Sequence, residues 1–372
     1  MPKTCALFPV LQLFFILVEI TDYIALYMKF EAITIKDIAK ALDLSPSTVS
    51  RALRDSYEIG EDTKKRVKNY AKQHNYRPNP AALSLKEKKT LSIGVVVSEI
   101  ANPFFSQIID GIESIAYDKG YNVIITQSKE SVEREKIILD YLTSRSVDGL
   151  IISVSAETNN SQELIELKER GLPLVFVDRI AENIETHKVT TDNFKGAFDA
   201  TQHLIKNGYH KIAVIANNQN LSITKDRLSG YLSASEENKM VVFDDLIFYC
   251  EHGATDADEV EKALTSLFER KQKPDAILAL SDKISTQILR YCVKNKIKIP
   301  EDVAVIGFSN SPDTELMHPP LSIIYQPALE MGEAAAEFLF QMIGSKRPTT
   351  SFETKVLTPK IITRESSIRS AP

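Results

Sequence analysis

At 372 residues the chain is long enough for more than one domain, and its net charge at pH 7 is −5. Its 43% hydrophobic and 26% charged residues are typical of a soluble globular protein. Three scattered cysteines exclude a disulfide framework and a cysteine zinc site, and they favour a reducing compartment. The sequence lacks the HExxH, GxSxG, Walker A and GxGxxG motifs, so we expect no enzyme, no cofactor and no metal.

The N-terminal segment holds an apolar run, residues 5–18, between Lys3 and Glu19. A run of 14 residues is too short to span a bilayer comfortably, and Pro9 and Gln12 interrupt it. The run resembles the core of a signal peptide, but no small-residue cleavage motif follows it.

Residues 34–54 predict two short helices joined by a tight turn. Thr34 is a good N-cap for the first helix, and the acidic residue three positions later completes a variant of the capping box. Ser45 caps the second helix, with Pro46 at its first position. The exposed face of this helix carries small hydroxyls and Arg51, which suits the reading of base edges in the major groove of DNA. A generic amphipathic helix pair is the alternative.

Charge is distributed unevenly along the chain. Residues 61–74 predict a third helix that carries five Lys or Arg residues. Residues 28–90 have a net charge of +6, whereas residues 91–372 have a net charge of −10. A small basic head ahead of a large acidic body suits binding of DNA phosphates by the head.

After residue 90, strand-like and helix-like segments alternate. Residues 91–97 and 174–177 are examples of apolar runs that predict buried strands, and residues 104–119 predict an amphipathic helix. The pattern restarts after a crossover near residues 189–191. Two such series imply two doubly wound parallel-sheet lobes, with a ligand site between them at the carboxyl ends of the strands.

Three motifs follow the helix pair in order: N-Y-R-P-N at residues 75–79, A-A-L-S-L-K at 81–86 and I-G-V-V-V at 93–97. This order resembles the LacI family of bacterial transcription regulators over about residues 30–366. The resemblance implies a periplasmic-binding-protein-like body whose chain crosses between the lobes three times. It also places the first helix close to the initiator, so we expect Met28 to be the true start and the preceding residues to be translated upstream sequence. A membrane tether and an atypical extension are the alternatives.

The expected fold class is an all-α helix-turn-helix head with an α/β body of two doubly wound parallel-sheet lobes. The expected parts are an apolar extension, 1–27, a DNA-binding domain, 28–77, a hinge segment, 78–90, and an effector-binding and dimerisation body, 91–366. Lobe one is expected at about 91–190 and 321–356, and lobe two at about 191–320 and 357–366. The crossovers are expected near Thr190, Pro320 and Leu357.

The resemblance places the second helix, residues 46–53, in the major groove. Segment 79–85 enters the minor groove, where Leu85 is the apolar wedge between base steps. The residues expected to contact DNA are Thr34, Pro46, Ser47, Thr48, Ser50, Arg51, Arg54, Asn79 and Leu85. Pro46 and Ser47 stand where some relatives have a bulkier or amide pair, so the operator sequences of those relatives do not transfer. Leu83 replaces the usual Arg and removes one phosphate contact.

The resemblance also implies an effector in the cleft, contacted by Phe105, Arg179, Asp192, Arg227, His252 and Asp282. Arg227 and Asp282 can each bind vicinal hydroxyls of a sugar bidentately, and a structural salt bridge between them is the alternative. The alternatives are a helix-core position for Phe105 and a helix cap for Asp192. Arg179 and Leu221 stand where purine-binding members have an aromatic residue and an Arg, which argues against a purine.

We therefore expect a cytoplasmic, sequence-specific regulator that binds a palindromic double-stranded DNA operator as a homodimer. A small-molecule effector, a sugar or sugar derivative, is expected to control its affinity for DNA. The sequence shows no terminal leucine heptad, which favours a dimer over a tetramer. The main rival interpretation is a secreted sugar-binding protein of a transporter. A third interpretation is a sugar-processing enzyme, but the sequence shows no constellation of catalytic residues to support it.

Overall fold

The computed structural model describes residues 33–77, 89–158, 161–252 and 256–369. The chain divides into two compact units, Met1–Lys88 and Lys89–Pro372, and each is described by itself. The expected initiator, the apolar run, Asn79 and Leu85 lie outside the described residues. Within the described residues, no helix has the length and apolar character that a membrane span requires.

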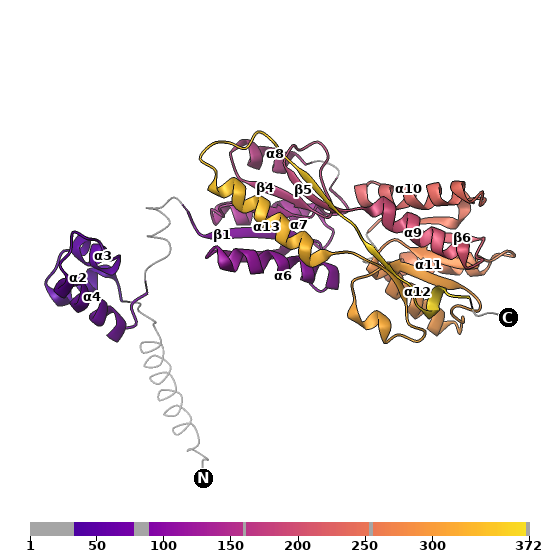
Figure 1. The fold of residues 1–372 in the computed structure, drawn as a ribbon, viewed down its shortest axis with the longest axis horizontal. Coiled ribbons are helices and arrows are strands. Elements are labelled where there is room, and N and C mark those ends of the chain that lie inside the picture. Colours follow the sequence, from indigo (N-terminus) through magenta and orange to yellow (C-terminus); the bar gives the residue numbers. More distant parts are fainter. Residues whose placement is uncertain (1–32, 78–88, 159–160, 253–255, 370–372) are drawn as a thin grey trace, which may run out of the picture. The chain divides into compact units, whose positions relative to one another are not determined.

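The described part of the head is formed by three short helices: α2 (Ile35–Leu42), α3 (Pro46–Leu53) and α4 (Glu61–Gln73), shown in Figure 1. The predicted caps are confirmed, because Thr34 and Asp37 form a reciprocal capping box and Ser45 caps α3 with Pro46 at its first position. Asp43 adopts a left-handed conformation with φ of 52°, which ends α2 in a tight turn. The apolar faces of the helices meet in a core of Ile38, Ala39, Val49, Ala52, Val67 and Ala71.

Lobe one is a parallel sheet in the order β11-β5-β4-β3-β1-β2. Its strands are β1 (Ser92–Val97), β2 (Asn122–Gln127), β3 (Leu150–Ile152), β4 (Leu174–Val177), β5 (His187–Thr191) and β11 (Thr354–Leu357). Its helices are α6 (Pro103–Asp118), α7 (Val132–Ser144), α8 (Gln162–Glu169) and α13 (Ala328–Gly344). In β1, Ile93 and Val95 pack with α6 and α13, whereas Val96 packs with α7. Both faces of the sheet are therefore buried, which explains the continuous apolar runs in the sequence.

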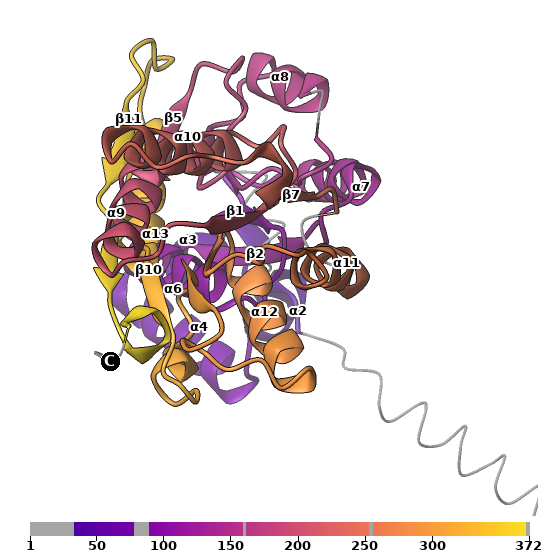
Figure 2. The same ribbon diagram turned by 90° about the vertical axis from the view of Figure 1, so that its right-hand side faces the viewer.

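Lobe two repeats this architecture in the strand order β12-β10-β9-β8-β6-β7. Its strands are β6 (Ile212–Asn217), β7 (Ile247–Cys250), β8 (Ala276–Ala279), β9 (Ala304–Phe308), β10 (Ser322–Tyr325) and β12 (Lys360–Ile362). Its helices are α9 (Asn193–Lys206), α10 (Ser222–Glu237), α11 (Ala257–Phe268) and α12 (Asp282–Lys294). Helices α9 and α10 pack in one core and α11 and α12 in another, on opposite faces of the sheet (Figure 2). Only β12 is antiparallel to its neighbour among the strand pairs of the described residues.

The chain crosses between the sheets after Thr191, at Gln326–Pro327 and at Thr358–Pro359, the last crossing lying in the yellow segment of Figure 1. Two details differ from the sequence expectation. Strand β5, expected only as a crossover, is a full member of the lobe-one sheet. Strand β10 belongs to lobe two, so the second crossing follows Tyr325 rather than Pro320. The reason is backbone pairing, because β10 bonds to β9 on one side and to β12 on the other.

One glycine sets the position of α10, which carries Arg227. A Cβ at Gly230 would lie 2.2 Å from the backbone oxygen of Phe194 in α9. Any side chain at this position would push α10 away from α9. The close approach brings the middle of α10 against the first turn of α9, and it places Arg227 beside Asn193.

Candidate functional site

Helix α3 presents a polar face. Pro46, Ser47, Arg51 and Arg54 are exposed, and Thr48 and Ser50 are half-buried. The Ser45 hydroxyl lies 2.7 Å from that of Ser47 and 2.8 Å from that of Thr48, so the hydroxyls of the first turn form one cluster. Thr34 of the cap of α2 is also exposed. The described residues that were expected to contact DNA are therefore largely accessible on the head.

The two arginines of this region have different partners. Arg54 donates to the backbone oxygen and the hydroxyl of Ser50, at 3.2 and 2.5 Å, and so lies along its own helix. Arg51 instead pairs with Glu58, with 2.8 Å between Nη1 and Oε2. Arg51 remains more than half exposed, which leaves it able to reach a base edge.

In the body, a small cavity of about 50 Å³ lies between the lobes at the carboxyl ends of the strands. The structure brings four of the six expected effector residues to this cavity: Phe105, Arg179, Arg227 and Asp282. Phe105 is buried beside Phe104, with 5.2 Å between the ring centroids in an edge-on arrangement. The cavity therefore combines an aromatic wall with charged groups from both lobes.

The other two expected residues do not line the cavity. Asp192 caps α9, accepting the backbone N–H of Lys195 at 2.9 Å, so the helix-cap alternative accounts for it. His252 is exposed, and its Nδ1 lies 3.8 Å from Glu157 Oε1 on the opposite lobe. The structure therefore does not place His252 at the cavity, contrary to the expectation.

Arg227 is buried and holds several elements together. Its Nε donates to Asn193 Oδ1 at 2.7 Å, its Nη1 to the backbone oxygen of Leu280 at 2.6 Å, and its Nη2 to Gln326 Oε1 at 3.4 Å. The guanidinium also stacks on Phe308, 3.7 Å from the ring centroid. Burial lowers the pKa of Arg227 to about 10, so it still carries its charge at neutral pH.

Asp282 lies at the first position of α12, after the cap residue Ser281, and accepts a hydrogen bond from the Ser309 hydroxyl. Burial raises the pKa of Asp282, although the Ser309 bond and nearby Lys283 oppose that rise. Asp282 and Arg227, both described, form no ion pair with each other, so the salt-bridge alternative does not hold in this conformation. Each keeps polar atoms for another partner.

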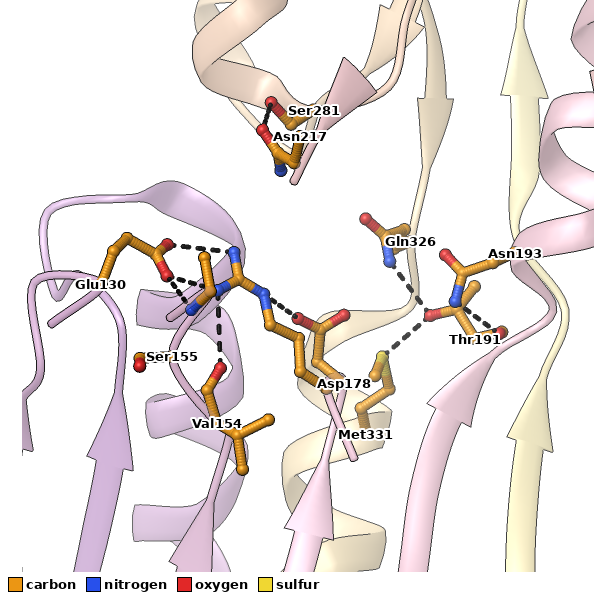
Figure 3. Close-up of polar contacts among 12 residues, drawn as sticks. Glu130, Val154, Ser155, Asp178, Thr191, Asn193, Asn217, Ser281, Gln326 and Met331 are labelled. Carbon is orange, nitrogen blue, oxygen red and sulfur yellow. Dashed lines mark hydrogen bonds and ion pairs between the residues drawn. The ribbon is translucent and has the colours of Figure 1, made fainter. Parts of the chain in front are cut away.

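Arg179 is bound within lobe one by residues that Figure 3 labels, among them Glu130 and Asp178. Its two terminal nitrogens donate to Glu130 at 2.6 and 3.0 Å, and both side chains are buried. Its Nε lies 3.9 Å from Asp178 Oδ2 in a buried ion pair, and Asp178 Oδ1 has no hydrogen-bond partner. Both residues line the cavity. All three nitrogens of the Arg179 guanidinium are therefore directed at carboxylates of its own lobe.

A chain of hydrogen bonds joins the cavity to the crossovers, and Figure 3 shows its link from Gln326 to Thr191. Gln326 donates to the Thr191 hydroxyl at 3.2 Å and accepts from Arg227, so its side chain links two crossovers to the cleft. The amide of Asn310 bonds to both backbone groups of Gln326, at 2.7 and 3.1 Å. Asn310 also receives and returns hydrogen bonds with Gln107 of lobe one.

The lobes are close together in this conformation. Lys283 of lobe two lies 2.6 Å from Glu99 of lobe one, and the Gln107–Asn310 contact closes the cleft deeper in. Ligand pockets usually enclose roughly 300–1,000 Å³. The cavity is much smaller, so a sugar-sized molecule requires the lobes or the lining side chains to separate.

Comparison with known proteins decides the family. Residues 90–364 match the model of periplasmic binding proteins and the sugar-binding domain of the LacI family, and residues 34–79 match the model of lacI-family bacterial regulatory proteins. The chain belongs to the LacI family. The HTH-type transcriptional repressor PurR of Aliivibrio salmonicida is 30% identical over 90% of this chain and 98% of its own.

Solved structures agree with that assignment. The chain is similar to the transcriptional regulator CelR in complex with cellobiose, with a TM-score of 0.67 and 28% identity over 90% of this chain and 99% of that one. It is also similar to a LacI-family regulator from Enterococcus faecium with bound ribose, with a TM-score of 0.64 and 28% identity over 74% of this chain and 98% of that one. The lac repressor dimer bound to operator, at 22% identity and a TM-score of 0.75, shows the same fold.

As a LacI-family member, the protein is a DNA-binding transcription regulator whose body binds a small-molecule effector. Several residues at the site were missed from sequence. Those at the cavity lie at or just after the carboxyl ends of strands: Asn217, Ser281, Asn310 and Gln326. A polar residue directly after an apolar strand was the available signal for them. Glu130 had no such signal, because only the folded chain brings it to Arg179.

Proposed function

We propose that the effector is a sugar or sugar derivative. The observation that carries this proposal is that Arg227 and Asp282 line the same cavity but form no ion pair with each other. A carboxylate accepts hydrogen bonds and a guanidinium donates them, so together they satisfy neighbouring hydroxyls of a sugar ring. Phe105 supplies an apolar wall for the opposite face of the ring, and Asp178, whose Oδ1 has no hydrogen-bond partner, adds an acceptor.

A purine base is the second candidate, since the PurR repressors are similar over nearly their whole length. Leu221 argues against it, because this residue is buried in an apolar cluster with Ala156 and Ile223 and offers no hydrogen bond. The regulators with cellobiose and ribose support a sugar.

The test is isothermal calorimetry of the full chain with a panel of mono- and disaccharides, including ribose and cellobiose, and with hypoxanthine and guanine. The chain has no Trp, so fluorescence is a poor reporter. We expect a sugar to bind, and Asp282→Ala to weaken it at least tenfold, since a charged buried partner is worth about 1.5–3 kcal/mol. Asp140→Ala, at an exposed position on α7, is the control. Tight binding of a purine with no sugar response would reject the sugar proposal.

For DNA binding we infer a homodimer on a palindromic operator. In this arrangement α3 lies in the major groove and segment 79–85 in the minor groove. The effector changes the angle between the lobes, and this motion alters the two hinge segments and hence the affinity for DNA. The regulator acts in the cytoplasm and catalyses no turnover of its effector. Sedimentation gives the oligomeric state, and selection from random duplexes should return inverted repeats. A monomer that selects single half-sites would contradict the inference.

A further inference from the structure

The turn after the recognition helix is firmly built. The backbone N–H of Ser56 donates to the backbone oxygen of Arg51 at 3.0 Å, and the Ser56 hydroxyl accepts the N–H of Glu58 at 3.4 Å. Asp55 adopts a left-handed conformation with φ of 56°, and its carboxylate lies 2.5 Å from Lys68 of α4. The turn is therefore fixed both to the end of α3 and to α4, which gives Glu58 a defined position.

Glu58 brings an anion to the arginine expected to read bases. The Arg51 and Glu58 side chains are 56% and 46% exposed, so they meet on the surface of the head rather than in its core. An exposed ion pair of this kind adds little to stability. In a head that must approach phosphates, a carboxylate beside the recognition helix opposes binding to DNA in general. A role in selecting the DNA sequence would account for a carboxylate that adds little stability and also opposes general binding to DNA.

We propose that Glu58 is a positioning residue that sets the sequence specificity of Arg51. Glu58 occupies Nη1 of Arg51, while a guanidinium has five N–H donors in a fixed plane. The remaining donors can bind O6 and N7 of guanine bidentately. Held in this way, Arg51 presents a defined edge to the groove. The inference rests on the proposed placement of α3 in the major groove.

The same pairing weakens non-specific binding. Affinity for arbitrary DNA comes from cations that neutralise phosphates, and it carries no sequence information. Glu58 cancels the charge of Arg51 toward a phosphate, so Arg51 adds little to non-specific complexes. In the specific complex, guanine supplies acceptors for the donors that Glu58 leaves open. Glu58 therefore increases the ratio of the affinity for the specific sequence to the affinity for other sequences.

The experiment uses the full-length protein and a duplex selected from a random library, with a scrambled duplex of the same composition as the non-specific probe. Glu58→Gln keeps the shape of the side chain and removes its charge. We expect it to raise affinity for the scrambled duplex about two- to fivefold, as loss of an exposed ion pair implies. The slope of the logarithm of its binding constant against the logarithm of salt concentration should steepen by about 0.9, which corresponds to one more phosphate neutralised. The ratio of specific to non-specific affinity should fall by at least about fivefold, the low end of what one bidentate contact discriminates.

Two controls separate positioning from a general change of charge. Asp62→Asn makes the same charge change at an exposed site in the first turn of α4 and should leave the specificity ratio unchanged. In an Arg51→Ala background, Glu58→Gln should no longer alter the ratio, because there is no guanidinium left to position. Melting temperatures verify that the variants are folded.

Equal ratios for Glu58→Gln and wild type would overturn the proposal. So would equal effects of Glu58→Gln and Asp62→Asn, which would show that only net charge matters. An effect of Glu58→Gln that persists without Arg51 would also overturn it. If selection instead shows that α3 does not read the duplex, the placement of α3 fails separately, because Arg51→Ala would then leave sequence preference intact.

Discussion

Replacing Glu130 by Gln should strongly destabilise the body. The structure gives Glu130 two short hydrogen bonds to Arg179, and the two side chains are 8% and 7% exposed. Removing one partner of a buried ion pair leaves the other charge uncompensated, which costs about 3–5 kcal/mol. Gln keeps one acceptor, so we place Glu130→Gln near 3 kcal/mol, the lower end of that range. A melting temperature about 6–12 °C below wild type should result.

The pH dependence tests the same reasoning. Burial alone would raise the pKa of Glu130, but the charge and hydrogen bonds of Arg179, together with hydrogen bonds from the Ala156 backbone and the Ser98 side chain, hold the pKa below its usual range. An acid with a lowered pKa stabilises the fold above its unfolded pKa of about 4.3, and this stabilisation is lost as pH falls through the lower folded value. The gap between wild type and Glu130→Gln should therefore be full at pH 7 and shrink below about pH 4.

Urea denaturation followed by circular dichroism measures both quantities. Glu133→Gln, at an exposed position on α7, is the matched control and should change stability by less than about 0.5 kcal/mol. A loss below about 1 kcal/mol for Glu130→Gln, or a gap that does not vary with pH, would refute the assignment of Glu130 as the charge partner of Arg179.

Three further substitutions test the cleft. Arg227→Met should weaken sugar binding at least tenfold and lower the free energy of unfolding by about 1–3 kcal/mol, because it orphans the buried acceptors at Asn193 and Leu280; calorimetry showing unchanged sugar affinity would contradict this. Gln326→Leu breaks the link between Arg227 and the crossovers, so gel-shift titrations should show the effector-induced change in operator affinity falling toward onefold; a change of wild-type size would rule out that link. Burial raises the pKa of Asp282 in the folded protein. The wild type therefore loses stability as the pH rises from the pKa of this residue in the unfolded chain, about 3.9, to its higher pKa in the folded protein. Asp282→Asn should lack that loss and melt higher at pH 7, whereas parallel pH profiles for the two proteins would count against the assignment.

Much of the head was predictable because its signals are local. The capping box at Thr34, the cap at Ser45 and the proline at position 46 act within one turn of helix, and the structure confirms all three. The lobes were predictable for a related reason, since strands buried on both faces must be apolar throughout. The carboxyl ends of those strands then marked the cleft, where Arg227 and Asp282 indeed lie.

The remaining features depend on contacts between distant residues. Arg179 and Glu130 are 49 positions apart, and no local pattern announces that the guanidinium is already occupied. Strand β10 joined lobe two because of its pairing with β9, although its own four residues would suit either sheet. An Asp at position 192 can cap α9 whether or not it also contacts an effector. Only its position outside the cavity shows that capping is the role that the structure supports. The sequence alone determined the helix-turn-helix, its basic charge and the two-lobed body, because caps, periodicity and composition are written in neighbouring residues. The tertiary structure decided which polar groups of the cleft stay available, because that depends on which partners the fold brings to each of them.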